Sequence, residues 1–208
     1  SDGIATQSRP LSQGALPAQS SLAVGSLDST TVVVTLGFDD MNFIKSQEEL
    51  AVSLQSSWIS IKTTTITDMN NNPVVAIDKS DAQVAKQFTS DTTKPELSSF
   101  SIDFNSHQTK AILEFTFTET MKAATFNTGE FVIMDGPSFT ATSFALQADS
   151  KSQTDATKLT VTLTTEQTNL IKKTLTMAVN ADTTYISVTA GAVFDMASNP
   201  IEQIGGTF

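Results

Sequence analysis

Short apolar segments that alternate with Ser and Thr recur along the second half of the chain. Each runs for about four to eight residues between clusters of turn-forming residues, a pattern typical of β-strands. The predicted strands cover residues 97–104, 111–118, 130–134, 142–147, 158–164 and 184–190. Ser and Thr together make up more than a quarter of the chain. The pattern therefore predicts an all-β protein built from β-sandwiches.

One helical pattern interrupts the strands, at TTEQTNLIKK (residues 164–173). The threonines at its start can cap a helix, and Glu166 lies in its first turn. Lys172 and Lys173 lie in its last turn, so the charges at both ends complement the helix dipole. We therefore expect a short crossing helix between two strands.

The chain repeats itself at an offset of 127 residues. Residues 28–77 align with residues 155–204 without a gap, and about a third of the aligned positions are identical. The same strand, helix, strand and turn are therefore expected twice. The two helices should begin near Asp39 and Glu166, and Trp58 should take the place of Tyr185.

The repeat predicts two domains, residues 1–90 and residues 91–208. Residues 88–97, FTSDTTKPEL, are polar and contain a proline, which favours an extended linker between the domains.

Each copy of the repeat is expected to be incomplete. The first copy has no counterpart of the predicted strands at residues 97–104 and 111–118, and the second has no counterpart of DAQVAKQF, residues 81–88. Such sandwiches would expose apolar surface and unpaired backbone groups. We therefore expect either an excerpt of a longer array or neighbouring chains that supply the missing strands.

The stretch TDMNNNPVV (residues 67–75) gathers oxygen-bearing side chains and admits two interpretations. As a weak calcium loop, it would use Asp68, Asn70 and Asn72, helped by Asp78 or Asp91. As a tight turn, it would use the tendency of Asp to bond nearby backbone, of Asn to adopt left-handed conformations and of Pro to fix an extended exit.

The second copy of this stretch favours the turn. Asp195 and Asn199 are kept, but Ala197 and Ser198 stand where the first copy has two asparagines. Calcium needs about six to eight oxygen ligands, so a loop that loses side-chain oxygens in its second copy is a poor site. We expect a structural turn, with calcium binding in the first copy as the alternative and no other cofactor.

A series of three motifs covers nearly all of residues 91–204, and the second half of the series occurs again in residues 28–91. The motifs are DTTKPELSSFSIDF, LEFTFTET and TTYISVTAGAVFDMASNPI. This series resembles the tandem immunoglobulin-like repeats of long extracellular proteins in algae and related protists, including those of flagellar mastigonemes, and more distantly bacterial immunoglobulin-like surface repeats. The resemblance implies tandem immunoglobulin-like β-sandwiches used as spacer, stiffening or adhesion modules. It also implies an extracellular, cell-surface or appendage location, with neighbouring copies as partners.

Charge and composition exclude several partners. The formal net charge is -10, which repels nucleic acid and anionic membrane surfaces. No apolar run approaches the roughly 18 residues of a membrane-spanning helix, so we expect no membrane insertion. The chain has no cysteine, which excludes disulfides and thiolate metal sites.

The sequence offers little for catalysis. His107 is the single histidine and lies in a polar turn, which leaves no nucleophile and base pair. Glu114 and Glu119 are five residues apart on a predicted strand and should point to opposite faces. Asp39 and Asp40 resemble a metal pair but are more simply explained as helix-dipole partners. We therefore expect no catalytic residue and no enzyme.

Trp58 and Tyr185 raise the alternative of a carbohydrate-binding accessory domain, because aromatic side chains can stack on sugars. A recurring aromatic residue in an apolar strand more simply indicates packing. The chain contains no Asn-x-Ser/Thr sequence, so any attached sugar of a glycoprotein would be O-linked.

Overall fold

The computed structural model describes residues 7–11, 21–22, 29–138 and 140–205. The chain divides into two compact units, unit 1 (Ser1–Asp91) and unit 2 (Thr92–Phe208). This division falls one residue beyond the expected boundary, and residues 88–96 form neither helix nor strand. The described residues are rich in antiparallel β-strands and contain two α-helices.

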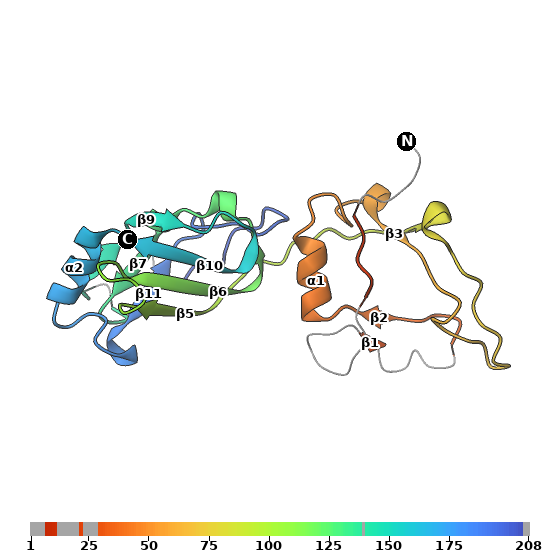
Figure 1. The fold of residues 1–208 in the computed structure, drawn as a ribbon, viewed down its shortest axis with the longest axis horizontal. Coiled ribbons are helices and arrows are strands. Elements are labelled where there is room, and N and C mark those ends of the chain that lie inside the picture. The colour runs from red at the N-terminus through yellow and green to blue at the C-terminus, as the bar shows by residue number, and fades with distance from the viewer. Residues whose placement is uncertain (1–6, 12–20, 23–28, 139, 206–208) are drawn as a thin grey trace. The chain divides into compact units, whose positions relative to one another are not determined.

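Unit 2 contains two antiparallel sheets, and its long strands are prominent in Figure 1. One sheet has the order β5-β6-β10-β9 and the other β11-β7-β8. The strands are β5 (Leu97–Asp103), β6 (Ile112–Met121), β7 (Phe131–Met134), β8 (Ser143–Ala145), β9 (Ala148–Lys151), β10 (Ala156–Leu163) and β11 (Tyr185–Val188). All except β9 fall on predicted segments. The sequence of β9, ADSK, has no apolar alternation that would have revealed it.

The core of unit 2 forms around β6. Leu113, Phe115 and Phe117 alternate along this strand and are at most 1% exposed, because alternate side chains of a strand share one face. Phe115 packs against Phe131 of β7, with ring centroids 4.8 Å apart. The two sheets therefore share a single core.

Helix α2 (Thr165–Lys173) confirms the predicted helix. Its N-cap is Thr164, whose hydroxyl accepts a hydrogen bond from the backbone N–H of Gln167 at 3.1 Å. The buried hydroxyl of Thr168 accepts from the backbone N–H of Ala111 at 2.9 Å. Ile171 is fully buried, so the helix is fixed to the start of β6 by both polar and apolar contacts.

Unit 1 has much less regular structure within its described residues. Its elements are β1 (Ser21–Leu22), β2 (Val34–Thr35), α1 (Phe38–Lys45), η1 (Leu54–Ser56), β3 (Trp58–Ile59), η2 (Lys79–Asp81) and β4 (Gln83–Val84). No described strand of this unit exceeds two residues. No described hydrophobic side chain of unit 1 is among the fully buried ones, all of which lie in unit 2.

Local geometry nevertheless repeats between the units at the predicted offset. Helix α1 begins at Phe38 and α2 at Thr165, and the short helices η1 and η5 (Ala181–Thr183) also correspond. Positive backbone φ angles occur at Ala51 and Ala178, which again are 127 positions apart. The repeated order of helix, strand and turn is therefore confirmed.

Strand pairing differs between the copies. Strand β3 pairs with β4, which places Trp58 opposite Val84. Strand β11 instead pairs with β7, which places Tyr185 opposite Met134, and it is an edge strand of its sheet among the described residues. Trp58 and Tyr185 therefore share a local position but not a strand partner.

We predict that unit 1 unfolds at a lower urea concentration than unit 2, because the buried apolar side chains lie in unit 2. Trp58 is the only tryptophan, so its fluorescence follows unit 1, while far-UV circular dichroism follows mainly the longer strands of unit 2. The fluorescence transition should come first. Phe115→Ala should destabilise unit 2 by about 3–5 kcal/mol and leave the fluorescence midpoint in place. Coincident transitions in both proteins would contradict this prediction.

Candidate functional site

The turn at residues 67–73 of unit 1 is closed by the carboxylate of Asp68. One oxygen, Oδ1, accepts the backbone N–H groups of Asn70 at 2.9 Å and Asn72 at 2.8 Å. The other, Oδ2, accepts the side-chain amide of Asn72 at 2.9 Å. Asn71 between them has a φ of 64°, a left-handed conformation that Asn tolerates well. The carboxylate therefore serves the turn itself.

Unit 2 reproduces this turn with Asp195. The backbone N–H and the side-chain amide of Asn199 donate to its two oxygens at 2.7 and 2.8 Å. Ser198 has a φ of 70°. The burial differs, because Asp195 is 1% exposed while Asp68 lies on an exposed turn. The feature common to both copies is the hydrogen-bonded turn.

The calcium candidate consists of Asp68, Asn70 and Asn72. Asn72 directs its amide nitrogen at Asp68, so these two side chains do not present paired oxygens to one cation. Within the described residues, Asp68 belongs to no group of three acidic or histidine side chains. Asp78 precedes η2 without capping it, and Asp91 forms an ion pair with Lys45 at 2.7 Å.

Unit 2 also brings together Glu119 and Asp195, which the sequence did not associate. A carboxylate oxygen of one lies within 4.8 Å of a carboxylate oxygen of the other, and both residues are buried. An isolated bridge between Met121 and Asp195 holds the turn against the end of β6.

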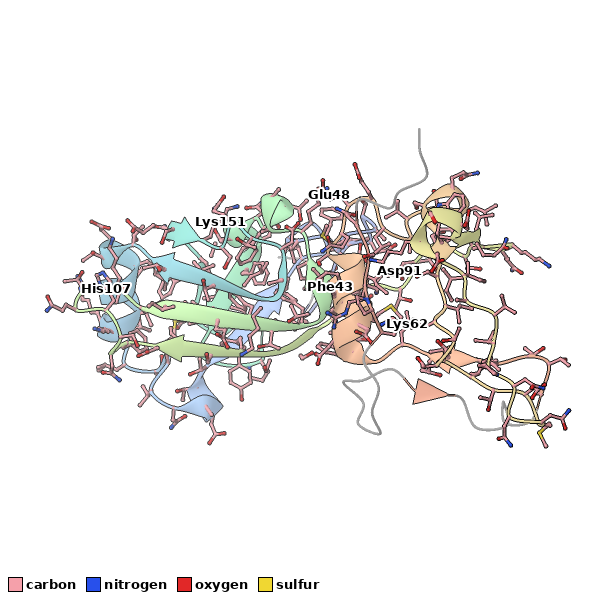
Figure 2. All side chains as sticks on the ribbon, turned by 45° about the vertical axis from the view of Figure 1, so that its right-hand side comes forward. Phe43, Glu48, Lys62, Asp91, His107 and Lys151 are labelled. Carbon is pink, nitrogen blue, oxygen red and sulfur yellow. The ribbon has the colours of Figure 1, made fainter. Side chains whose placement is uncertain are left out.

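The catalytic candidates are dispersed. His107 is exposed in the loop between β5 and β6 (Figure 2), where its Nδ1 accepts from the backbone N–H of Thr109 at 3.3 Å. Glu114 lies outside the core and pairs with Lys158 at 2.7 Å, whereas Glu119 is buried, so the two occupy opposite faces as their spacing predicts. Glu114 and Glu119 therefore do not face each other as an acid and base pair would.

Asp39 and Asp40 lie in the first turn of α1, as expected for residues that complement the helix dipole. Asp40 is fully buried and accepts a hydrogen bond from Nε of Arg9 at 2.7 Å. The Arg9 guanidinium also lies 4.7 Å from the ring centroid of Phe43, a cation–π contact. The two aspartates therefore have different environments and do not form a matched metal pair.

The two aromatic candidates also differ. Trp58 is 52% exposed, and its indole N–H donates to the carbonyl of Gln55 at 2.7 Å. Tyr185 is half-buried. Only Trp58 therefore offers a broad exposed ring.

No family model, curated protein or solved structure matches the chain. The described helices are all too short or too polar to cross a membrane. What the structure establishes is a β-rich chain in which an Asp–Asn turn recurs.

Hydrogen bonding lowers the pKa of Asp68 below its ordinary value of 3.8, chiefly through the side chain of Asn72, then through the backbone of Asn72 and of Asn70. A lowered pKa stabilises the turn above pH 3.8, and this contribution disappears as the pH falls through the folded-state pKa.

Asn72→Ala should raise the pKa of Asp68 in an NMR titration, and Asn199→Ala should leave it unchanged. Repeating the titration with calcium tests the alternative, because a bound ion would lower this pKa further.

The left-handed residue of the turn gives a second prediction. Ser198→Val should destabilise unit 2 by about 1–2 kcal/mol, because a β-branched residue is strained at positive φ. Ser198→Asn is the matched control, since unit 1 has Asn71 at this position, and it should be nearly neutral. Urea denaturation followed by circular dichroism measures both. Equal effects of the two substitutions would show that φ at this position does not limit stability.

Proposed function

We propose that residues 1–208 are a non-enzymatic structural repeat module of an extracellular filament or cell-surface protein, where they provide spacing, stiffening or adhesion. Each unit is an immunoglobulin-like β-sandwich with one short crossing helix, and unit 1 is an incomplete one. The recurrence of the helix, the strand and the Asp–Asn turn at an offset of 127 residues carries this proposal. Self-similarity at a fixed period is the mark of repeat architectures.

The two ends of unit 2 are bonded directly to each other. The backbone N–H of Glu202 donates to the carbonyl of Pro95 at 2.8 Å. Its carboxylate pairs with Lys94 at 3.0 Å, although both side chains are half exposed. Tension applied through the chain on either side of unit 2 would load these contacts first, which supports a mechanical role.

The turn of unit 2 adds a second attachment near the same end. The backbone N–H of Lys122 donates to the carbonyl of Phe194 at 2.9 Å, next to the bridge between Met121 and Asp195. Residues 194–202 are therefore fixed both to the end of β6 and to the segment that precedes β5. Pulling them away requires the hydrogen bonds of both attachments to break.

Neighbouring copies of the same module are the partners of this proposal, with an extracellular surface or appendage as the location. Any sugar attached to the module would be O-linked, because the chain contains no Asn-x-Ser/Thr sequence. The net charge of -10 argues against nucleic acid as a partner.

The exposed ring of Trp58 favours one alternative, a carbohydrate-binding accessory domain. A glycan array separates the two functions. Binding that is lost in Trp58→Ala would establish the alternative, and its absence is the result that the structural module predicts.

Single-molecule pulling tests the mechanical proposal. Unit 2 should unfold in one step at a resolvable force, with an extension of several hundred Å for a chain of this length. Glu202→Pro removes the N–H donor to Pro95 and should lower that force. Lys94→Ala is the control and should change it little, because exposed ion pairs contribute little. Unfolding without a resolvable force in the unsubstituted chain would contradict a mechanical role.

A further inference from the structure

Apolar positions that form the core of unit 2 are exposed in unit 1. Leu159, Val161 and Val193 are fully buried in unit 2. Their counterparts at an offset of 127 residues are Val32, Val34 and Ile66, which are 39%, 47% and 41% exposed. The sequence keeps these positions apolar in both copies, but only one copy covers them.

Unit 2 shows what covers these positions. Strand β6 runs antiparallel to β10 and places Phe115 opposite Leu159 and Leu113 opposite Val161. In the described part of unit 1, β2 pairs only with β1, which precedes it in the chain as β9 precedes β10. No described strand of unit 1 takes the place of β6.

Val33 makes the same segment apolar on its other face. It is 50% exposed, whereas the matching residue of unit 2 is Thr160, on the polar outer side of β10. Continuous apolar residues along a strand are typical of strands that are covered on both faces. Residues 32–34 are therefore apolar on both faces, as in an internal strand, but are exposed as in an edge strand.

We propose that residues 29–36 of unit 1 pair with an extended polypeptide strand from outside residues 1–208, in the antiparallel register that β6 adopts on β10. The partner strand carries aliphatic or aromatic side chains at alternate positions, as Leu113, Phe115 and Phe117 do in β6. Main-chain hydrogen bonds hold it to the edge, and the alternate side chains cover Val32 and Val34. This inference rests on the proposed function, because an array places other polypeptide next to each unit.

A second copy of residues 1–208 is not expected to donate its own β6. This strand already lies between β5 and β10, and its Leu113, Phe115 and Phe117 are at most 1% exposed. Donating β6 would therefore require unit 2 of that copy to unfold.

The test uses the intact chain and a peptide with the sequence of residues 110–122, KAILEFTFTETMK. The matched control peptide carries Ser in place of Leu113, Phe115 and Phe117. The first peptide should slow amide hydrogen exchange across residues 29–36 by about tenfold or more, since exchange follows local opening. It should also raise the urea midpoint of Trp58 fluorescence, and the control peptide should do neither. Val34→Asp in the chain should abolish both effects.

Three results would overturn the inference. They are unchanged exchange with the first peptide, equal effects of the two peptides, and self-association of the chain in sedimentation that protects residues 29–36 without any peptide. The last result would identify a second copy as the occupant. The pulling experiment on unit 2 is independent of this edge, so failure of the peptide to bind leaves the mechanical function standing.

Discussion

The pairing of β6 with β10 is the interaction on which unit 2 depends. It places Leu113 opposite Val161 and Phe115 opposite Leu159, all fully buried, and each such side chain contributes about 1.5–3 kcal/mol when it leaves water. The repeated half of the unit is attached at both ends of this strand, through Thr168 of α2 at its start and through the Asp–Asn turn at its end. Strand β6 therefore connects the helix, the turn and the second sheet.

The parts that the sequence predicted correctly are those that depend on local chemistry. Helix α2 follows from its capping threonine and its terminal charges, and the Asp–Asn turn follows from residue types that favour it in isolation. Strand β9 was missed because ADSK has no alternation. The pairing of Trp58 with β4 and of Tyr185 with β7 was also beyond prediction, since neighbours in a sheet are set by distant segments.

In the candidate site, the hydrogen bonds of the turn are set by nearby residues, whereas its burial is set by distant segments. Asp68 and Asp195 accept equivalent hydrogen bonds from Asn72 and Asn199, as the matching sequences indicate. Their burial differs because Asp195 lies against Met121 at the end of β6. A buried carboxylate needs hydrogen-bond donors from the protein. The exposed Asp68 can bond to water instead, so the hydrogen bonds of the turn matter more for the stability of unit 2 than for that of unit 1. The proximity of Glu119 to Asp195 likewise arises only when β6 and the turn meet.

Comparison of the two units separates what each part of the repeat contributes. Unit 1 keeps the helix, the turn and its positive φ angle while the described residues around it include no counterpart of β6. Local hydrogen bonds therefore suffice to shape these elements, but they do not bury the apolar positions beside them. Burial in unit 2 requires β6 and β7, whose sequences lie outside the repeated half. The repeated half therefore encodes its local shape, whereas burial of its apolar positions in unit 2 also requires strands from outside that half.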